Sequence, residues 1–283
     1  MVFQPKQITH YQAKHLIELQ GNVSEAAIEY CLSQLPPFSE GDVIHDNACG
    51  SGAVTETIMN SKPPPIQIYD TDINPQFVQG CAELAKKNDW PVSTAVMSAL
   101  ELTFPDDMFT HSFTTFAFHC LGDHTKAAEQ VYRTLKPGGT AVASIWISMP
   151  HVDALQHAHW LTRGKEGPMP ALLPLESYQE KDLRGALESG GFKAEHIACS
   201  TKECNLTMPD VKRWAQLAWS YLGTLPTGWS QNDEDKWEEA LADIVEQISS
   251  GDGFNKNEKG ETVMTMVACI AIAKKIGRIA VGD

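Results

Sequence analysis

The order of apolar and polar positions between residues 42 and 147 predicts strands that alternate with helices. Five apolar runs have the length and β-branched content of buried strands, namely DVIHDN, IQIYD, VSTAV, HSFTTFAF and TAVASIWI. The segment AVTETIM between the first two has helical spacing. Such alternation predicts an α/β fold with a doubly wound, parallel sheet that binds ligands at the carboxyl ends of its strands.

Two further helices of this region have clear ends. Asn74 is placed to cap a helix whose first position is Pro75, and the apolar stripe of that helix comprises Val78, Cys81, Ala82 and Ala85. A helix is also expected from about 124 to 135, with Pro137 and Gly138 stopping it before the next strand.

The flanking parts predict additions to this core. Residues 8–35 have the pattern of two short helices, and Asn22 with Glu25 suits the start of the second. After residue 150 we expect a loop, then a helix in YQEKDLRGALESGGF, a strand in KAEHIACS, tryptophan-bearing helices, and a long strand in ETVMTMVACIAIAKK. The predicted organisation is an N-terminal helical lid at 1–40, a core at 41–204 with a loop insertion at 151–177, a helical cap at 205–258, and a final strand and tail at 259–283.

Composition narrows the possible partners. The 283 residues carry 36 acidic and 22 basic side chains, and a net charge of -14 opposes binding to nucleic acid backbones. No stretch approaches the roughly 18 uninterrupted apolar residues of a membrane helix, and the N-terminus shows no secretory signal. We therefore expect a cytoplasmic protein with a small-molecule partner, either monomeric or dimeric.

The seven cysteines are scattered, odd in number and never spaced as CxxC. This pattern favours reduced thiols over a disulfide framework or a zinc site. The sequence thus predicts no metal.

The segment VIHDNACGSGAVT, residues 43–55, predicts a cofactor turn between a strand and a helix. A dinucleotide fingerprint has a third glycine where this chain has Thr55. Asp46 would repel a diphosphate, whereas it could hold the ammonium of S-adenosylmethionine (SAM), directly or through water. Asp72, 20 residues beyond Gly52, is placed to accept hydrogen bonds from ribose hydroxyls of either cofactor. Asp70 is the alternative, but Asp72 directly precedes the INP turn and is favoured. Asp46 therefore favours SAM.

Over residues 40–200 the chain resembles class I SAM-dependent methyltransferases. The motifs are DNACGSG, in which Ala48 replaces the first glycine of the family, with DTDINPQF, MSALELTFPDDMF and YRTLKPGG. The resemblance implies a Rossmann-like, mostly parallel sheet of seven strands with the last antiparallel, helices on both faces and a helical cap insertion. Ser98 stands where many members have an aspartate for the adenine amino group. The implied SAM-binding residues are Tyr11, Asp46, Ala48, Gly50, Gly52, Asp72, Ile73, Met97, Ser98, Ala99 and Phe116. Tyr11 has packing of a helix on the core as its alternative role.

Methyl transfer from SAM chiefly requires an in-line acceptor and a dry pocket. A thiol acceptor ionises far more readily than a phenol and so needs less help from a base. The candidate bases are His119 and Asp123, with His124 beside them, although His119 also suits a packing role and transfer by proximity alone needs no base. Cys120 is expected to be a small buried group. Acceptor-binding candidates are Trp146, His151, Trp214 and Trp219, for which packing within the cap is the alternative.

The whole chain is similar to methyltransferases of fungal secondary metabolism, including those that S-methylate dithiols of the gliotoxin type. This similarity implies thiol methylation of a small metabolite. An O- or N-methyltransferase and a non-catalytic SAM-binding regulator stay open as alternatives.

Overall fold

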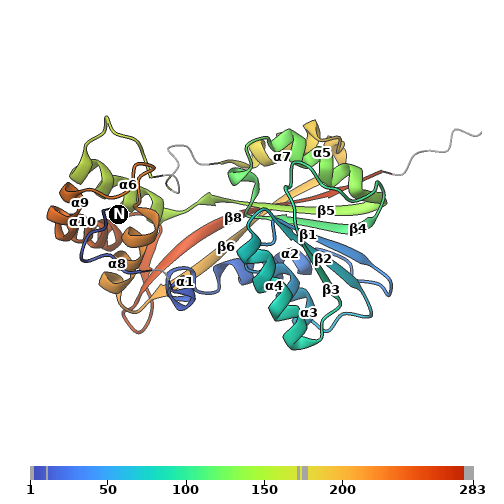
Figure 1. Cartoon of the computed structure of the whole chain (residues 1–283), viewed down its shortest axis with the longest axis horizontal. Helices are drawn as coiled ribbons and strands as arrows, with labels where there is room; N and C mark the ends of the chain where they lie inside the picture. The colour runs from blue at the N-terminus through green and yellow to red at the C-terminus, as the bar shows by residue number, and fades with distance from the viewer. Residues whose placement is uncertain (1–2, 11, 171–172, 174–177, 277–283) are drawn as a thin grey trace, which may run out of the picture. The chain divides into compact units, whose positions relative to one another are not determined.

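A computed structural model describes residues 3–10, 12–170, 173 and 178–276. Its sheet follows the order β3-β2-β1-β4-β5-β8-β6, and a short additional strand pairs with β8 (Figure 1). The α/β class is confirmed. The predicted seven strands become eight because Phe254–Lys256 (β7) forms an antiparallel hairpin with Thr262–Lys274 (β8).

The strands that precede the predicted helices are parallel. The strand β1 (Val43–Asn47) lies between β2 (Gln67–Asp72) and β4 (Phe109–Thr115), while β3 (Val92–Val96) pairs with β2. Next to β4 is β5 (Leu135–Ser148), and β6 spans Ile197–Met208. Parallel pairing brings the carboxyl ends of β1 to β4 to one edge of the sheet, where the predicted turns lie.

Helices cover both faces of this part of the sheet (Figure 1). On one face lie α2 (Val23–Ser33), α3 (Ala53–Asn60) and α4 (Pro75–Asn88). On the other lie α5 (His124–Thr134) and α7 (Glu180–Ser189), which pack with β4, β5 and β8 around a buried cluster that includes Phe109, Leu135, Val131 and Leu187.

Local capping explains where two of these helices begin. The side chain of Asn74 accepts a hydrogen bond from the amide of Gln76 at 2.9 Å, and Pro75 occupies the first turn, as predicted. Asp123 caps α5 by accepting from the amide of Lys126 at 2.9 Å. The helix α5 ends at Thr134, in agreement with the predicted end at about residue 135, and Leu135 then pairs with Phe109 in the sheet.

The structure consists of two compact units. The first, called here the sheet unit, comprises residues 24–147, 178–202 and 268–283, and the second, called the helical unit, comprises 1–23, 148–177 and 203–267. The strands β6 and β8 contribute residues to both.

The helical unit contains α1 (Ala13–Gln20), α6 (Pro150–Arg163), α8 (Val211–Leu222), α9 (Gln231–Asp235) and α10 (Trp237–Ser250). The helix α6 corrects the expectation of a loop from residue 151. Its Pro150 occupies the first turn, where a missing N–H costs nothing, and its buried Val152, Leu155 and Ala158 have helical spacing. None of the helices in the described part of the chain has the length and hydrophobicity to cross a membrane.

Candidate active site

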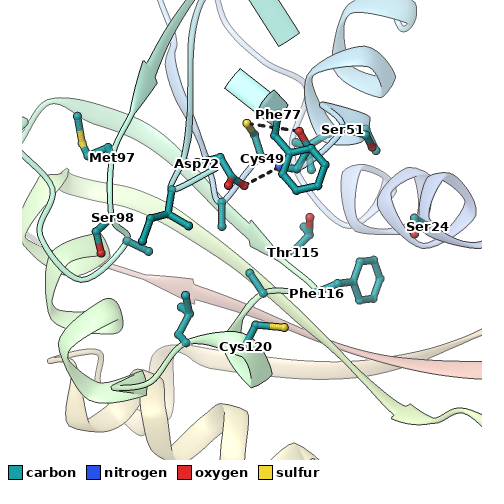
Figure 2. Close-up of a pocket in the computed structure, with 18 of the residues that line it drawn as sticks. Ser24, Cys49, Ser51, Asp72, Phe77, Met97, Ser98, Thr115, Phe116 and Cys120 are labelled. Atoms are coloured by element: carbon teal, nitrogen blue, oxygen red, sulfur yellow. Dashed lines mark hydrogen bonds between the residues drawn. The ribbon is translucent and has the colours of Figure 1, made fainter. Parts of the chain in front are cut away.

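A cavity of about 480 Å³ lies at the carboxyl ends of β1 to β4 within the sheet unit (Figure 2). Its size falls within the range of small-molecule sites, roughly 300–1,000 Å³. Its walls come from the turns after these four strands, from the first turn of α4 and from α2. The predicted residues that line it are Ala48, Gly50, Asp72, Ile73, Met97, Ser98, Ala99 and Phe116.

The turn between β1 and α3 has a left-handed backbone at three alternate positions. Ala48, Gly50 and Gly52 have φ of 56°, 54° and 84°. Glycine adopts this conformation freely, whereas the Cβ of Ala48 makes the same conformation sterically strained. Gly52 is the N-cap of α3, and a Cβ there would lie 3.0 Å from the Sγ of Cys81. Gly52 therefore permits the turn to pack closely against Cys81, and it is not among the residues that line the cavity.

Asp72 ties this turn to the end of β2. Its Oδ2 accepts a hydrogen bond from the amide of Gly50 at 3.0 Å, and its Oδ1 accepts from the amide of Asn74 at 2.8 Å. Figure 2 shows the carboxylate directed at the turn while it lines the cavity. These contacts fix its orientation and leave further acceptor capacity for ribose hydroxyls.

Asp46 is placed differently from what the sequence suggested. Its side chain is 1% exposed and faces Thr55, whose Oγ1 lies 3.5 Å from Oδ2 of Asp46 and 2.7 Å from Oδ1 of Asp70. Burial, followed by repulsion from Asp70, raises the pKa of Asp46 well above its usual range. The sequence predicted that Asp46 places a fixed negative charge at the cavity, whereas the structure buries this carboxyl group beside Thr55 and Asp70. Binding of the SAM ammonium by Asp46, directly or through water, stays a prediction.

Apolar and polar side chains line the part of the cavity expected to hold adenine and ribose. Met97, Ser98, Ala99 and Leu100 follow β3. The Oγ of Ser98 accepts a hydrogen bond from the amide of Leu100 at 3.2 Å, so it supports its own turn. Ile73 is 72% exposed, an unusual state for a large apolar side chain that suits cover by a ligand.

Phe116 forms the opposite side of the cavity, together with Thr115 and Cys120 (Figure 2). Its ring stacks on Trp146 with centroids 4.3 Å apart and planes 8° apart. Its backbone has a φ of 53°, and its N–H donates a hydrogen bond of 2.8 Å to the carbonyl oxygen of Ser144. A strained backbone retained beside a cavity is typical of functional positions. Trp146 thus contributes through Phe116 rather than as a lining residue.

Neither predicted base is among the described residues that line the cavity. Asp123 is exposed and occupied as the cap of α5. His119, in the short 3-10 helix Phe118–Cys120, faces Tyr178 with ring centroids 6.1 Å apart, and burial with the charge of nearby His124 lowers its pKa. Cys120, expected to be buried, is exposed and lines the cavity. The catalytic assignments of His119 and Asp123 stay predictions.

The other acceptor candidates pack within the helical unit. Trp219 is 1% exposed and lies against Arg163, whose Cζ is 4.7 Å from its ring centre. The Nε1 of Trp214 donates to the carbonyl of Leu19 at 3.0 Å, and His151 lies edge-on to Trp214, where burial lowers the His151 pKa to about 4. These contacts favour packing roles, and acceptor binding by the three residues stays a prediction. Tyr11 lies outside the described residues.

The sequence reasoning missed several cavity residues, namely Ser24, Ile28, Cys49, Ser51, Phe77, Thr115 and Cys120. Phe77 carried a usable signal, because it is a large apolar residue in the first turn of the helix after Asp72. In the structure it is 40% exposed and lines the cavity. Ser24 and Ile28 carried none, since α2 precedes the sheet in sequence and reaches the cavity only through the fold.

Comparison with known proteins gives the class of this enzyme. Residues 45–143 match a family model described as methyltransferase domain. The chain is 26% identical over 254 residues to methyltransferase tpcH of Aspergillus fumigatus, covering 82% of this chain and 84% of that relative. It is 28% identical over 183 residues to acetylaranotin bis-thiomethyltransferase of Aspergillus terreus, covering 58% and 59% of the two chains.

Solved structures agree on the fold. The YcgJ protein from Bacillus subtilis has a TM-score of 0.58 at 13% identity, covering 89% of this chain and 99% of its own. A geranyl diphosphate methyltransferase in complex with SAM has a TM-score of 0.51 at 14% identity, covering 89% and 85%.

The matching domain, the relatives and the fold together support a class I, SAM-dependent methyltransferase. The protein is a SAM-dependent enzyme, and SAM is its cofactor. The cavity fits this ligand, since it offers an oriented carboxylate at Asp72, backbone groups of a strained turn, and apolar surfaces at Ile73 and Met97.

Proposed function

We propose that this enzyme S-methylates the thiols of a small dithiol metabolite, in two successive transfers. The relative from Aspergillus terreus supports the proposal by its printed activity as a bis-thiomethyltransferase. The proposal deepens the methyltransferase assignment by naming the acceptor atom.

The chemistry of the cavity wall carries the proposal. Among the described residues that line it, Asp72 is the only carboxylate, and there is no histidine, lysine or arginine. Asp72 is already oriented by two backbone amides, which suits a binding role rather than proton transfer. An acceptor at this site receives no strong base, and a thiol with an ordinary pKa of about 8.5 needs none.

Bound SAM supplies a methyl group already activated by its sulfonium. The residues of the chain then have to orient the acceptor and exclude water. The ring of Phe116, which stacks on Trp146, provides a rigid aromatic face on the side of the cavity opposite Asp72. Such a face favours an apolar acceptor and a nearby cationic sulfur.

The test compares acceptors that differ in the reacting atom. The full chain is incubated with SAM and a small dithiol, its monothiol, a phenol or an amine, and products are read by mass spectrometry. We expect gains of about 14 and 28 mass units from the dithiol, for one and two added CH2 groups, and about 14 from the monothiol. Exclusive methylation of the phenol or the amine would overturn the proposal.

A pH profile adds an independent readout. If no enzyme base takes part, the rate should rise with ionisation of the acceptor thiol and shift when a thiol of lower pKa is used. The same profile in His119→Asn is expected. If the variant instead lost rate mainly below the thiol pKa, so that its rise moved toward that pKa, His119 would be a catalytic base.

A further inference from the structure

Three side chains of types that commonly ligate metals come from three different elements and meet beneath the β1–α3 turn. Cys49 lies in the turn, Asp70 in β2 and Cys81 in α4. All three are buried, and one ligand atom from each lies within 4.8 Å of the other two. The two Sγ atoms are 3.7 Å apart.

The cluster contains a buried acceptor without a partner. Asp70 is 1% exposed, and while its Oδ1 accepts from the hydroxyl of Thr55 at 2.7 Å, its Oδ2 has no hydrogen bond. Leaving a buried carboxyl oxygen unpaired is unfavourable, because the group has lost its hydrogen bonds to water without replacement. Asp46 lies next to Asp70, and in the described part of the chain neither carboxyl group forms an ion pair.

The geometry suits a tetrahedral thiophilic cation. Zinc bonds thiolate sulfur at about 2.3 Å, so two thiolates on a tetrahedral zinc lie about 3.8 Å apart. The observed separation of 3.7 Å is close to this value. A cation would also neutralise the group of acidic side chains. Metal coordination deprotonates thiols even where the pKa is raised, as it is for Cys49 by its hydrogen bond with Cys81 and then by burial.

We propose that Cys49, Cys81 and Asp70 bind a zinc-like divalent cation, with the fourth position open to the adjacent Asp46. The bound ion would join the glycine turn, β2 and α4, the three elements that shape one side of the cofactor cavity. Its role is structural and lies beyond methyl transfer, so it does not depend on the acceptor proposed above. It reverses the expectation of no metal, which rested on cysteine spacing alone.

The test measures zinc binding by the full chain after removal of metal with a chelator. Zinc is titrated in competition with a chromophoric chelator, and cadmium serves as a second probe through its ultraviolet thiolate charge-transfer band. We expect one ion per chain and a rise in melting temperature on loading. Cys81→Ala should weaken binding by at least about 100-fold, because even residues that only support metal ligands typically contribute 10- to 100-fold.

Two further variants make the result decisive. Cys269→Ala, which changes another buried cysteine in β8, is the matched control and should bind zinc as the wild type does. Asp70→Asn keeps the acceptor for Thr55 and removes the charge, so it serves if Cys81→Ala does not fold. Binding of the demethylated product of SAM verifies the fold of each variant. Absence of zinc uptake and of the cadmium band would show a protonated, hydrogen-bonded cluster and overturn the proposal, as would wild-type affinity in a folded Cys81→Ala or Asp70→Asn.

Discussion

The carboxylate of Asp72 accepts a hydrogen bond from the amide of Gly50 at 3.0 Å, which links the ends of two neighbouring parallel strands. Gly50 belongs to the turn after β1, and Asp72 is the last residue of β2. A single side chain thus orients both the turn and its own acceptor atoms toward the cavity.

Replacing Asp72 by alanine should weaken SAM binding by about 10- to 100-fold, since hydrogen bonds to a charged group typically contribute 1.5–3 kcal/mol. Isothermal titration calorimetry with SAM gives the affinity directly. Asp123→Ala is a matched control, because this carboxylate caps α5 and lies in an exposed position. It should lower stability by about 1 kcal/mol without changing SAM affinity. Unchanged affinity in Asp72→Ala would refute the assignment of Asp72 to the ribose.

Ala48→Gly should stabilise the protein. Ala48 has φ of 56°, and relief of the left-handed strain of about 1–2 kcal/mol exceeds the entropic cost of glycine, about 0.4–1 kcal/mol. Urea unfolding should show a net gain of up to about 1 kcal/mol. As a comparison, Ala82→Gly within α4 should be destabilising by about 1 kcal/mol. A loss of stability in both variants would contradict the strained turn.

Gly52→Ala should be destabilising by about 1–3 kcal/mol. Its φ is 84°, and the added Cβ would lie 3.0 Å from the Sγ of Cys81. Gly80 lies in α4 with open space where a Cβ would be, so Gly80→Ala should instead be stabilising by about 0.5–1 kcal/mol. Thermal melts of the two variants should therefore move in opposite directions. Equal shifts of one sign would remove the turn geometry as the explanation.

His151 should make the fold less stable in mild acid. Burial lowers its folded-state pKa to about 4, whereas an unfolded histidine has a pKa of about 6.5. Between these values the unfolded chain binds a proton that the folded chain does not, so stability falls as pH falls, by up to about 1.4 kcal/mol per pH unit. His151→Leu removes this contribution.

The measurement is the free energy of unfolding of wild type and His151→Leu between pH 8 and pH 4.5. The two curves should run parallel above pH 7 and converge or cross below it, because the variant has the shallower slope. Parallel curves throughout this range would show that the pKa of His151 is not lowered by the fold.

Local chemistry in the sequence determined much of the core. The apolar runs of β1 to β4 and the Asn74–Pro75 helix start depend on neighbours within a few residues, and the structure confirms them. Gly50 and Asp72 also lie where their motifs predicted, because both follow directly from the ends of parallel strands. The helix α6 was missed since its proline and histidines resemble a loop when the burial of Leu155 and its neighbours is unknown.

Only the tertiary structure decided which polar groups are buried and which side chains meet. Asp46 faces Thr55 and Asp70 instead of the cavity, because the paired strands β1 and β2 place the two acids at the same level under α3. Phe116 stacks on Trp146, 30 residues away, and Cys49 meets Cys81. The periodicity of apolar and polar residues reflects local structure formed by residues close together in the chain, so it can be read from the sequence. Desolvation and long-range contacts depend on elements that come together only when the chain folds, so they could not be read from the residues alone.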